Sequence, residues 1–247
     1  MIAIALLTLN PKRELIEFYK NISTNNYDFY CIVDNNNINK SLINDNVNFI
    51  QIDDHFCARN GFHGFNPVIR KRNAPLVSAW DKAIFYFCRL NRSYEHIWFV
   101  EDDVFVPDFN LFQTTDSRYQ NTDLLSSKIE VNVTGELKSW VWWKMASHSN
   151  IPLPWAKSMV CAFRVSKILL QLLDQHVSKN KNKYKFIEYI FHTLALHNEL
   201  TVKEADSLSG IVYRRDWVKE DLNFNTFYHP VKSIEQQILF REYLNGK

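Results

Sequence analysis

Three consecutive acids, Glu101, Asp102 and Asp103, directly follow the apolar run at 97–100. Carboxylates this close together repel one another, and an adjacent buried strand makes their ionised forms costlier still. A divalent cation would offset that cost, because Mg²⁺ and Mn²⁺ bind carboxylate oxygens and often keep open positions for substrate phosphates. The pattern predicts a metal and diphosphate site; the alternative is an acidic loop that only ends a strand.

Polar residues also end the earlier apolar runs. Thr8 and Asn10 end the first run, Asp34 ends the second, and Asp53 and Asp54 end the third. In open α/β sheets, ligands bind outside the carboxyl ends of the parallel strands. We therefore expect these residues to share one acidic rim with the acids at 101–103.

The elements that must position this rim alternate along the first half of the chain. Apolar runs and helical spacing predict strands at 2–9, 27–33, 47–52 and 97–100 and helices at 11–21 and 77–90. This order favours a mainly parallel sheet covered on both faces by helices. The second half is less regular, with strands expected at 123–126, 155–165 and 200–202, helices at 166–176, 186–197 and 235–243, and no assignment for 132–150.

Composition excludes several classes of protein. Of the 247 residues, 46% are hydrophobic and 15% aromatic, which is ample for one large core, while five glycines argue against a glycine-rich phosphate loop. The net charge is +2 and the basic runs, at 70–72 and 179–185, are short, which disfavours a nucleic-acid partner. We read the second basic run as a solvated loop.

The cysteines and the amino terminus indicate the redox state of the thiols and the location of the protein. Cys31, Cys57, Cys88 and Cys161 show no C-x-x-C spacing, so we expect reduced, structural thiols and no zinc knuckle. The apolar start lacks the basic region and cleavage site of a signal peptide, and no run reaches the roughly 18 apolar residues of a membrane span. We therefore expect a soluble, cytoplasmic protein with no membrane span.

The run I-W-F-V-E-D-D-V-F around the three acids resembles the DXD-type motif, in its E-D-D form, of GT-A fold nucleotide-sugar-dependent glycosyltransferases. The resemblance implies that Asp103 ligates the metal and Glu101 faces the ribose or sugar, with Asp102 between them in the diphosphate site. It extends over residues 1 to about 110.

Upstream residues extend the same resemblance. It implies that Thr8 and Asn10 line the nucleotide pocket, that Asp34 contacts the base, and that Lys82, in the helix before the motif, reaches toward the nucleotide. An acid that accepts from a base imino N–H favours uracil, so the implied donor is a UDP-sugar.

Downstream, Phe227-Tyr228-His229-Pro230 is followed by Lys232. Many GT-A enzymes take a further metal ligand from a C-terminal His, with nearby basic residues on the diphosphate. Imidazole suits Mn²⁺, and a lysine ammonium suits phosphate. His229 and Lys232 are the candidates; the alternative for His229 is a surface side chain before a proline turn.

Glu188 is the candidate general base. An inverting transferase needs a carboxylate that removes the proton from the acceptor hydroxyl, and in the GT-A fold such a base commonly lies near the start of a helix. A Glu in a first helical turn can also merely favour the helix dipole. Asp123 and Asp206 are rivals, and His192, one turn along, is expected to be structural.

Four tryptophans surround the unassigned segment. Aromatic faces stack on sugar rings, so an acceptor platform that includes Trp142 is one interpretation and core packing is the other. The tryptophans are Trp140, Trp142, Trp143 and Trp155.

Together these patterns predict a single GT-A-like α/β domain over residues 1–247, with a central, mostly parallel mixed sheet flanked by helices. We expect a nucleotide-sugar-binding half at about 1–110 and an acceptor-binding half at about 111–247. The predicted activity is Mn²⁺- or Mg²⁺-dependent transfer of a sugar from a nucleotide-sugar donor to a carbohydrate or other hydroxyl acceptor, with inversion. The alternatives are a sugar nucleotidyltransferase, a metal-dependent phosphohydrolase and a non-catalytic carbohydrate-binding protein.

Overall fold

The computed structural model describes residues 1–20, 26–39, 47–66, 77–183 and 185–246. The basic run at 70–72 lies outside these residues. Of the second basic run, Lys179, Lys181 and Lys183 are exposed, as expected, but Lys185 is buried. Its ammonium donates to the carbonyls of Asn180, Lys181 and Lys183 at 2.7–3.3 Å, so this lysine closes the turn instead of facing solvent.

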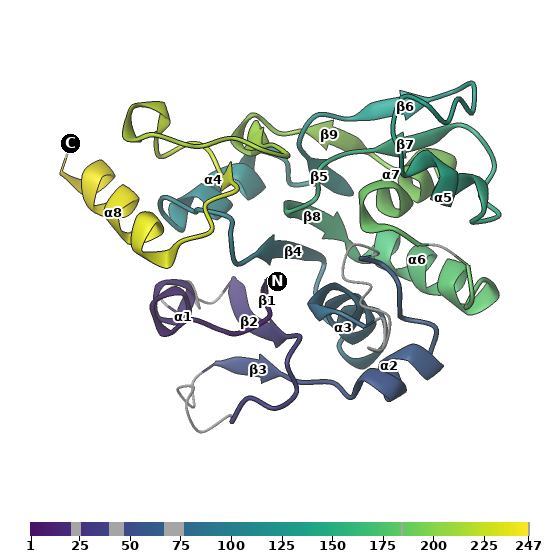
Figure 1. Ribbon diagram of the computed structural model, residues 1–247, viewed down its shortest axis with the longest axis horizontal. Coiled ribbons are helices and arrows are strands. Elements are labelled where there is room, and N and C mark those ends of the chain that lie inside the picture. The colour runs from purple at the N-terminus through teal and green to yellow at the C-terminus, as the bar shows by residue number, and fades with distance from the viewer. Residues whose placement is uncertain (21–25, 40–46, 67–76, 184, 247) are drawn as a thin grey trace.

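A seven-stranded sheet forms the centre of the described part of the chain (Figure 1). Its strands are, in spatial order, β3 (Asn48–Ile50), β2 (Tyr27–Val33), β1 (Ile2–Thr8), β4 (His96–Glu101), β8 (Ala162–Ser166), β5 (Leu124–Ser126) and β9 (Val202–Glu204). Only β8 runs antiparallel to its neighbours. The predicted α/β class with a mostly parallel mixed sheet is confirmed.

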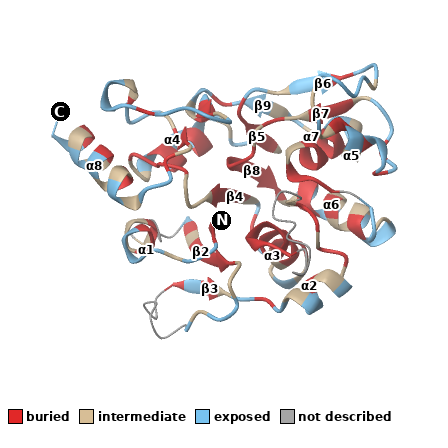
Figure 2. Cartoon of the chain, viewed as in Figure 1, coloured by how far each residue is buried: buried red, intermediate tan, exposed pale blue. Residues whose placement is uncertain are grey.

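Alternate residues along each strand face opposite sides of the sheet, as the period of two requires. In β1, Ala3, Ala5 and Leu7 join one core cluster, while Ile4 and Leu6 join the other. The buried residues in Figure 2 follow the strands and the inner faces of the helices. Helices therefore cover both faces, as predicted.

The helices divide between these two clusters. Helices α3, α6 and α7 pack on one face, and α1 and α4 on the other, while α8 joins a third, smaller cluster with Phe105, Trp217 and Tyr228. Their bounds are α1 (Arg13–Lys20), α2 (Asp54–Arg59), α3 (Ala79–Phe85, continued by a π-helical turn Tyr86–Leu90), α4 (Asn110–Arg118), α5 (Trp143–Ser147), α6 (Lys167–Lys179), α7 (Ile187–His197) and α8 (Ile234–Asn245), with short 3₁₀ turns at Asp206–Leu208 and Lys219–Asp221. No helix within these described ranges has both the length and the apolar character needed to cross a bilayer.

The strand expected at 155–165 is wrong as a single element. It is split into β7 (Trp155–Lys157), which pairs with β6 (Glu130–Asn132) outside the central sheet, and β8. The chain turns between them because Ser158 N–H donates to the carbonyl of Glu188 at 3.0 Å and its hydroxyl contacts that of Ser127 at 2.9 Å. Strand β8 then enters the sheet beside β4.

A small parallel pair lies over the carboxyl end of β4. It consists of β10 (Gly210–Ile211) and β11 (Tyr228–His229), and Phe105 bridges to Tyr228. Val231 N–H donates to the carbonyl of Asp103 at 2.7 Å. The C-terminal segment is thereby fixed against the acids that follow β4.

Candidate active site

The carboxyl ends of β1, β2 and β4 bring the first predicted site residues together. Asp34 N–H donates to the carbonyl of Thr8 at 2.9 Å, and Asp102 N–H donates to the carbonyl of Leu7 at 3.1 Å. The Thr8 hydroxyl donates to Asp102 Oδ2 at 2.5 Å. Burial raises the pKa of Asp102, and the Thr8 hydrogen bond opposes that rise. Thr8, Asp34 and Asp102 therefore form one rim, as parallel strand order predicts.

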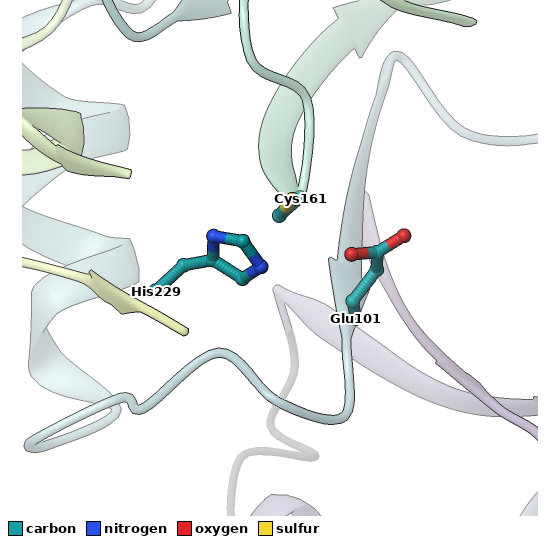
Figure 3. A group of neighbouring side chains, drawn as sticks. All are labelled: Glu101, Cys161 and His229. Atoms are coloured by element: carbon teal, nitrogen blue, oxygen red, sulfur yellow. The ribbon is translucent and has the colours of Figure 1, made fainter. Parts of the chain in front are cut away.

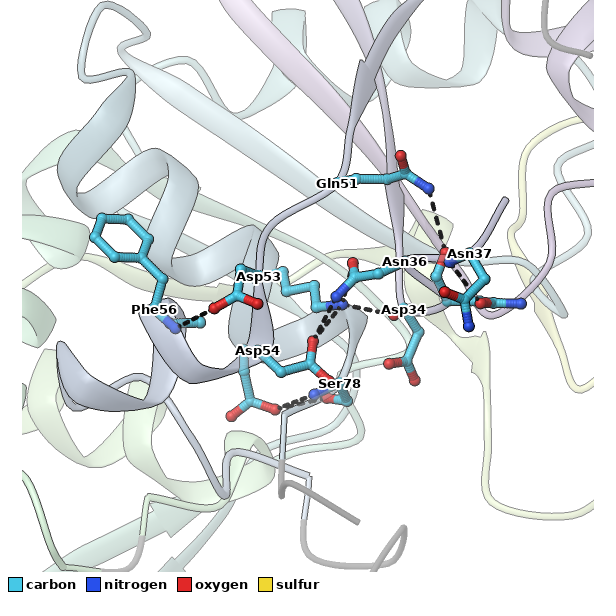
Figure 4. Close-up of polar contacts among 12 residues, drawn as sticks. Asp34, Asn36, Asn37, Gln51, Asp53, Asp54, Phe56 and Ser78 are labelled. Carbon is cyan, nitrogen blue, oxygen red and sulfur yellow. Dashed lines mark hydrogen bonds and ion pairs between the residues drawn. The ribbon is translucent and has the colours of Figure 1, made fainter. Parts of the chain in front are cut away.

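Lys82 lies beneath this rim. Its side chain is fully buried, and its ammonium donates to the Asp34 carbonyl at 2.5 Å and to Asn36 Oδ1 at 2.9 Å, and pairs with Asp54 Oδ1 at 2.8 Å. Figure 4 shows Asp34, Asn36 and Asp54 converging on this point. Burial raises the pKa of Asp34, and the charge of Lys82 opposes the rise. Lys82 thus holds the loop after β2 in place.

Glu101 is fixed on two sides. Trp80 Nε1 donates to Glu101 Oε1 at 2.6 Å, and Glu101 N–H donates to the carbonyl of Cys161 at 2.8 Å. Burial raises the pKa of Glu101 and the charge of Asp103 raises it further, while hydrogen bonds from the Trp80 indole and the Cys161 thiol oppose both. A positive charge next to Glu101 would lower the free-energy cost of its ionised form.

His229 meets Asp103 from the C-terminal segment. His229 Nε2 lies 3.6 Å from Asp103 Oδ2, while His229 Nδ1 donates to the carbonyl of Val212 at 2.7 Å. Burial on its own would lower the pKa of His229, but its interactions with Asp103 outweigh that effect and raise it. Because Nδ1 carries the bonded proton, Nε2 is the atom that faces the acids, as in a metal-binding histidine held by a carbonyl.

The site has the donors that a divalent cation needs. Asp103 Oδ1 is buried and has no hydrogen-bond partner among the described residues. Glu101, Cys161 and His229 each offer a ligand atom, and these atoms lie within 4.8 Å of one another (Figure 3). An orphaned carboxylate oxygen beside an oriented imidazole fits a metal ion better than it fits a solvated loop.

Two adjoining cavities flank this cluster. The smaller, about 190 Å³, is lined by Thr8, Asp34, Ser78, Trp80 and Asp102, among others. The larger, about 330 Å³, is lined by Glu188, His229, Lys232, Tyr213 and Arg214, among others. Asn66, Glu101 and Asp103 line both. Glu101 and Asp103, at the carboxyl end of β4, therefore lie between the two cavities.

Glu188 lies in the first turn of α7, partly buried, on the wall of the larger cavity. Burial raises its pKa to about 7; Lys157 and His229 oppose this rise and Glu101 adds to it. A carboxylate with a pKa near neutrality, in the same cavity as the metal-type ligands, has the properties of a general base.

The rivals for that role lie elsewhere. Asp123 accepts from the Thr201 hydroxyl at 2.7 Å, and Asp206 pairs with Arg118 at 2.8 Å. The described residues that line the two cavities include neither acid. His192 is buried, and its Nε2 contacts the Ser126 hydroxyl at 2.9 Å.

Asn10, Lys82 and Trp142 are absent from the described linings of both cavities. Asn10 is exposed and accepts from Asn35 Nδ2 at 3.2 Å. Trp142 is half-buried against Phe186, with ring centroids 5.3 Å apart, and Phe186 in turn lines the larger cavity. The tryptophan thus supports a cavity wall from behind in this conformation.

Four residues of the larger cavity that carry polar groups were not predicted from the sequence: Asn66, Cys161, Tyr213 and Arg214. Cys161 was interpreted as a core thiol, because an apolar run gives no sign of which strand will lie beside it. Tyr213-Arg214 carries no motif. Its one usable feature is the basic side chain of Arg214, because basic residues near the His229 segment are expected to contact the diphosphate.

The chain matches no protein-family model, and no curated protein matches it significantly. Among solved structures it is similar to an active-site mutant of LgtC, with 12% identity, a TM-score of 0.49, and coverage of 98% of this chain and 95% of that one. It is also similar to the galactosyltransferase LgtC in complex with donor and acceptor sugar analogues (12% identity, TM-score 0.48, coverage 99% and 96%). A third is the apo form of mouse xyloside xylosyltransferase 1 (8% identity, TM-score 0.40, coverage 83% and 86%). These values are too low to carry a function over to this chain.

Proposed function

We propose that this protein is a metal-dependent glycosyltransferase of GT-A type that transfers a sugar from a nucleotide-diphosphate donor, a UDP-sugar, to a hydroxyl acceptor. One observation carries the proposal: two cavities meet at Glu101 and Asp103. The smaller contains the strand-end residues suited to a nucleotide, and the larger contains a near-neutral carboxylate suited to a base. A transferase needs this arrangement because the acceptor hydroxyl must reach the donor's anomeric carbon, which is bonded to the diphosphate.

The nucleotide would occupy the smaller cavity. Asp34 and Thr8 line it, and Asp34 can accept from a base imino N–H, which favours uracil. Lys82 would act on the nucleotide indirectly, by holding the Asp34 loop. Asn10 would need to turn inward from its bond with Asn35 to join the pocket.

The diphosphate would lie between the cavities. Asp103 and His229 would hold the divalent ion, which supplies positive charge to the leaving diphosphate. Lys232 is exposed, lines the larger cavity and adds an ammonium on the same side. Fixed positive charge aimed at the leaving group lowers the barrier because that group gains negative charge in the transition state.

The acceptor would occupy the larger cavity. Glu188 would remove the proton from the acceptor hydroxyl as its oxygen bonds to the anomeric carbon and the nucleoside diphosphate leaves from the opposite face of the sugar, and this direct displacement gives inversion. Phe186, backed by Trp142, supplies an apolar wall on which a sugar ring can pack. The nucleotide half, about 1–110, and the acceptor half, about 111–247, then correspond to the two cavities.

The test is a thermal-shift screen of nucleotide diphosphates and UDP-sugars with and without divalent ions, followed by a UDP-release assay with an acceptor panel. Ligands that bind the native state raise the melting temperature. UDP release that depends on both metal and acceptor supports the transferase. Release of phosphate, or exchange of pyrophosphate into the donor, would favour a phosphohydrolase or a nucleotidyltransferase instead. Binding of sugars without turnover would indicate a non-catalytic protein.

A further inference from the structure

Glu101 and Cys161 are neighbours across two strands. Val100 pairs with Ala162 in the antiparallel β4–β8 ladder, and Glu101 N–H donates to the Cys161 carbonyl at 2.8 Å, which extends the ladder by one residue. Residues directly opposite each other in a sheet project to the same face. The carboxylate and the thiol therefore lie together on the side from which His229 approaches (Figure 3).

The chemistry of this trio differs from that of an all-oxygen site. A carboxylate, a thiol and an imidazole are the three side-chain types that bind zinc in proteins. Their ligand atoms lie within 4.8 Å of one another, so small side-chain movements would bring all three to the roughly 2.0–2.3 Å at which zinc binds its ligands. The His229 ring is already oriented, since Nδ1 donates to the Val212 carbonyl. Asp103 Oδ1, which has no hydrogen-bond partner among the described residues, lies beside it.

Cys161 is set apart from the other thiols by its neighbours. All four cysteines are free and buried. Cys57 Sγ donates to the Phe62 carbonyl at 3.1 Å, and Cys88 Sγ donates to the Leu170 carbonyl at 3.4 Å. Among the described residues, Cys161 is the one thiol grouped with a histidine and an acid.

We propose that Cys161 and Glu101 are further ligands of the ion that Asp103 and His229 would hold, so that the site prefers Zn²⁺ or Co²⁺ to Mg²⁺. This inference rests on the proposed function in one respect: the ion bound by Cys161 is the same ion that would contact the donor diphosphate. On binding, the thiol loses its proton to solvent and the thiolate takes its place at the ion. Thiolate selects softer ions, whereas Mg²⁺ requires an octahedral shell of oxygens, which this trio cannot supply.

The test is a Co²⁺ titration of the full chain followed by absorption spectroscopy. A thiolate bound to Co²⁺ gives an intense charge-transfer band in the near ultraviolet, and carboxylate and imidazole do not. Wild-type protein should show this band at one equivalent of Co²⁺. Cys161→Ser should lose the band and bind Co²⁺ about 100-fold more weakly. Cys57→Ser, which removes a buried thiol elsewhere, should keep both the band and the affinity.

Metal ranking gives a second measurement. Zn²⁺ and Co²⁺ should raise the melting temperature of the wild type more than equimolar Mg²⁺ does, and Cys161→Ser should narrow that difference. If wild type binds Co²⁺ without the band, or if the band persists in Cys161→Ser, Cys161 is not a ligand. Either result would leave the proposed glycosyltransferase function unaffected. If wild type shows the band but does not turn over any UDP-sugar, the metal-site assignment is supported and the proposed function is contradicted.

Discussion

His229 Nε2 lies 3.6 Å from Asp103 Oδ2, although the two side chains come from segments far apart in the sequence. Two backbone contacts bring them together: Phe105 pairs with Tyr228, and Val231 N–H donates to the Asp103 carbonyl. Gln237, buried in α8, donates to the carbonyls of Asp102 and Val231 at 3.0 and 2.9 Å. The C-terminal segment is therefore a structural part of the site.

Asp103→Asn should abolish metal-dependent nucleotide-sugar binding and turnover. The amide keeps the size of the side chain but removes the charge that would hold the ion, and Oδ1 has no other partner among the described residues. The measurement is the thermal shift by UDP with and without Mn²⁺, together with UDP release. Asp216→Asn, on the exposed loop after Arg214, is the matched control and should behave as wild type. Unchanged metal-dependent turnover in Asp103→Asn would rule out the assignment.

His229→Ala should lower the affinity for the metal ion by about 10-fold or more. Nucleotide binding in the absence of metal should stay nearly unchanged. The reason is that the imidazole would be lost from the ion but does not line the smaller cavity. Metal affinity is measured by isothermal titration. His55→Ala removes an exposed histidine from α2 and serves as the control. Equal metal affinity in wild type and His229→Ala would exclude His229 as a ligand.

Asp34→Asn should reduce the preference for uridine over adenosine diphosphate. An aspartate accepts from the imino N–H of uracil, whereas an amide offers both a donor and an acceptor and can pair with either base edge. We expect the discrimination to fall by about 10-fold, since one lost charge-assisted hydrogen bond costs roughly 1.5 kcal/mol. Competition binding with UDP, ADP and GDP measures it. If wild type binds UDP and ADP equally, Asp34 is not a base contact.

The rim residues were predictable because each belongs to a strand whose apolar run and polar end are local features. Thr8, Asp34 and Asp102 needed only parallel order to meet. Cys161 is different, because its place beside Glu101 depends on an antiparallel strand that enters between β4 and β5. No local pattern encodes that pairing.

The Trp-rich segment remained unassigned for a related reason. It forms one five-residue helix, α5, and its rings pack on one another and on Phe186: Trp140 and Trp143 lie 4.8 Å apart, and Trp140 and Phe186 lie 5.8 Å apart. Irregular backbone stabilised by ring contacts has no period for a sequence to show. The burial of Trp143 and Trp155 favours packing for these two rings.

Glu188→Gln should lower kcat by about 10²- to 10⁴-fold while leaving donor affinity nearly intact, because the amide keeps the shape and removes the basicity. In wild type, the rate should rise with pH through about 7, where Glu188 becomes ionised. Glu136→Gln, at an exposed position, is the control. An NMR product spectrum with the donor's anomeric configuration retained, or full activity in Glu188→Gln, would remove Glu188 from the base role.

The same substitution should stabilise the protein at high pH, in the presence of a chelator. Burial raises the pKa of Glu188 to about 7 in the folded state from a value of 4.5, so between these values the native state holds a proton that the unfolded state has lost. The stability that this proton confers is fully present below pH 4.5 and is lost as the pH rises through 7. The charges of Lys157 and His229 lower the pKa of Glu188 and the charge of Glu101 raises it, and the value of about 7 includes all three effects.

Glu188→Gln carries no such titration, so its free energy of unfolding should equal that of wild type near pH 4 and exceed it by about 1–2 kcal/mol at pH 8. Denaturant unfolding at a series of pH values measures the difference, and Glu136→Gln should show no such trend because that side chain is exposed. A partly buried catalytic carboxylate predicts a gain of stability together with a loss of turnover, since its ionised form destabilises the fold but is required for catalysis. If the difference between Glu188→Gln and wild type stays constant from pH 4 to pH 8, the carboxyl group does not titrate near neutrality and cannot serve as the proposed base in its present surroundings.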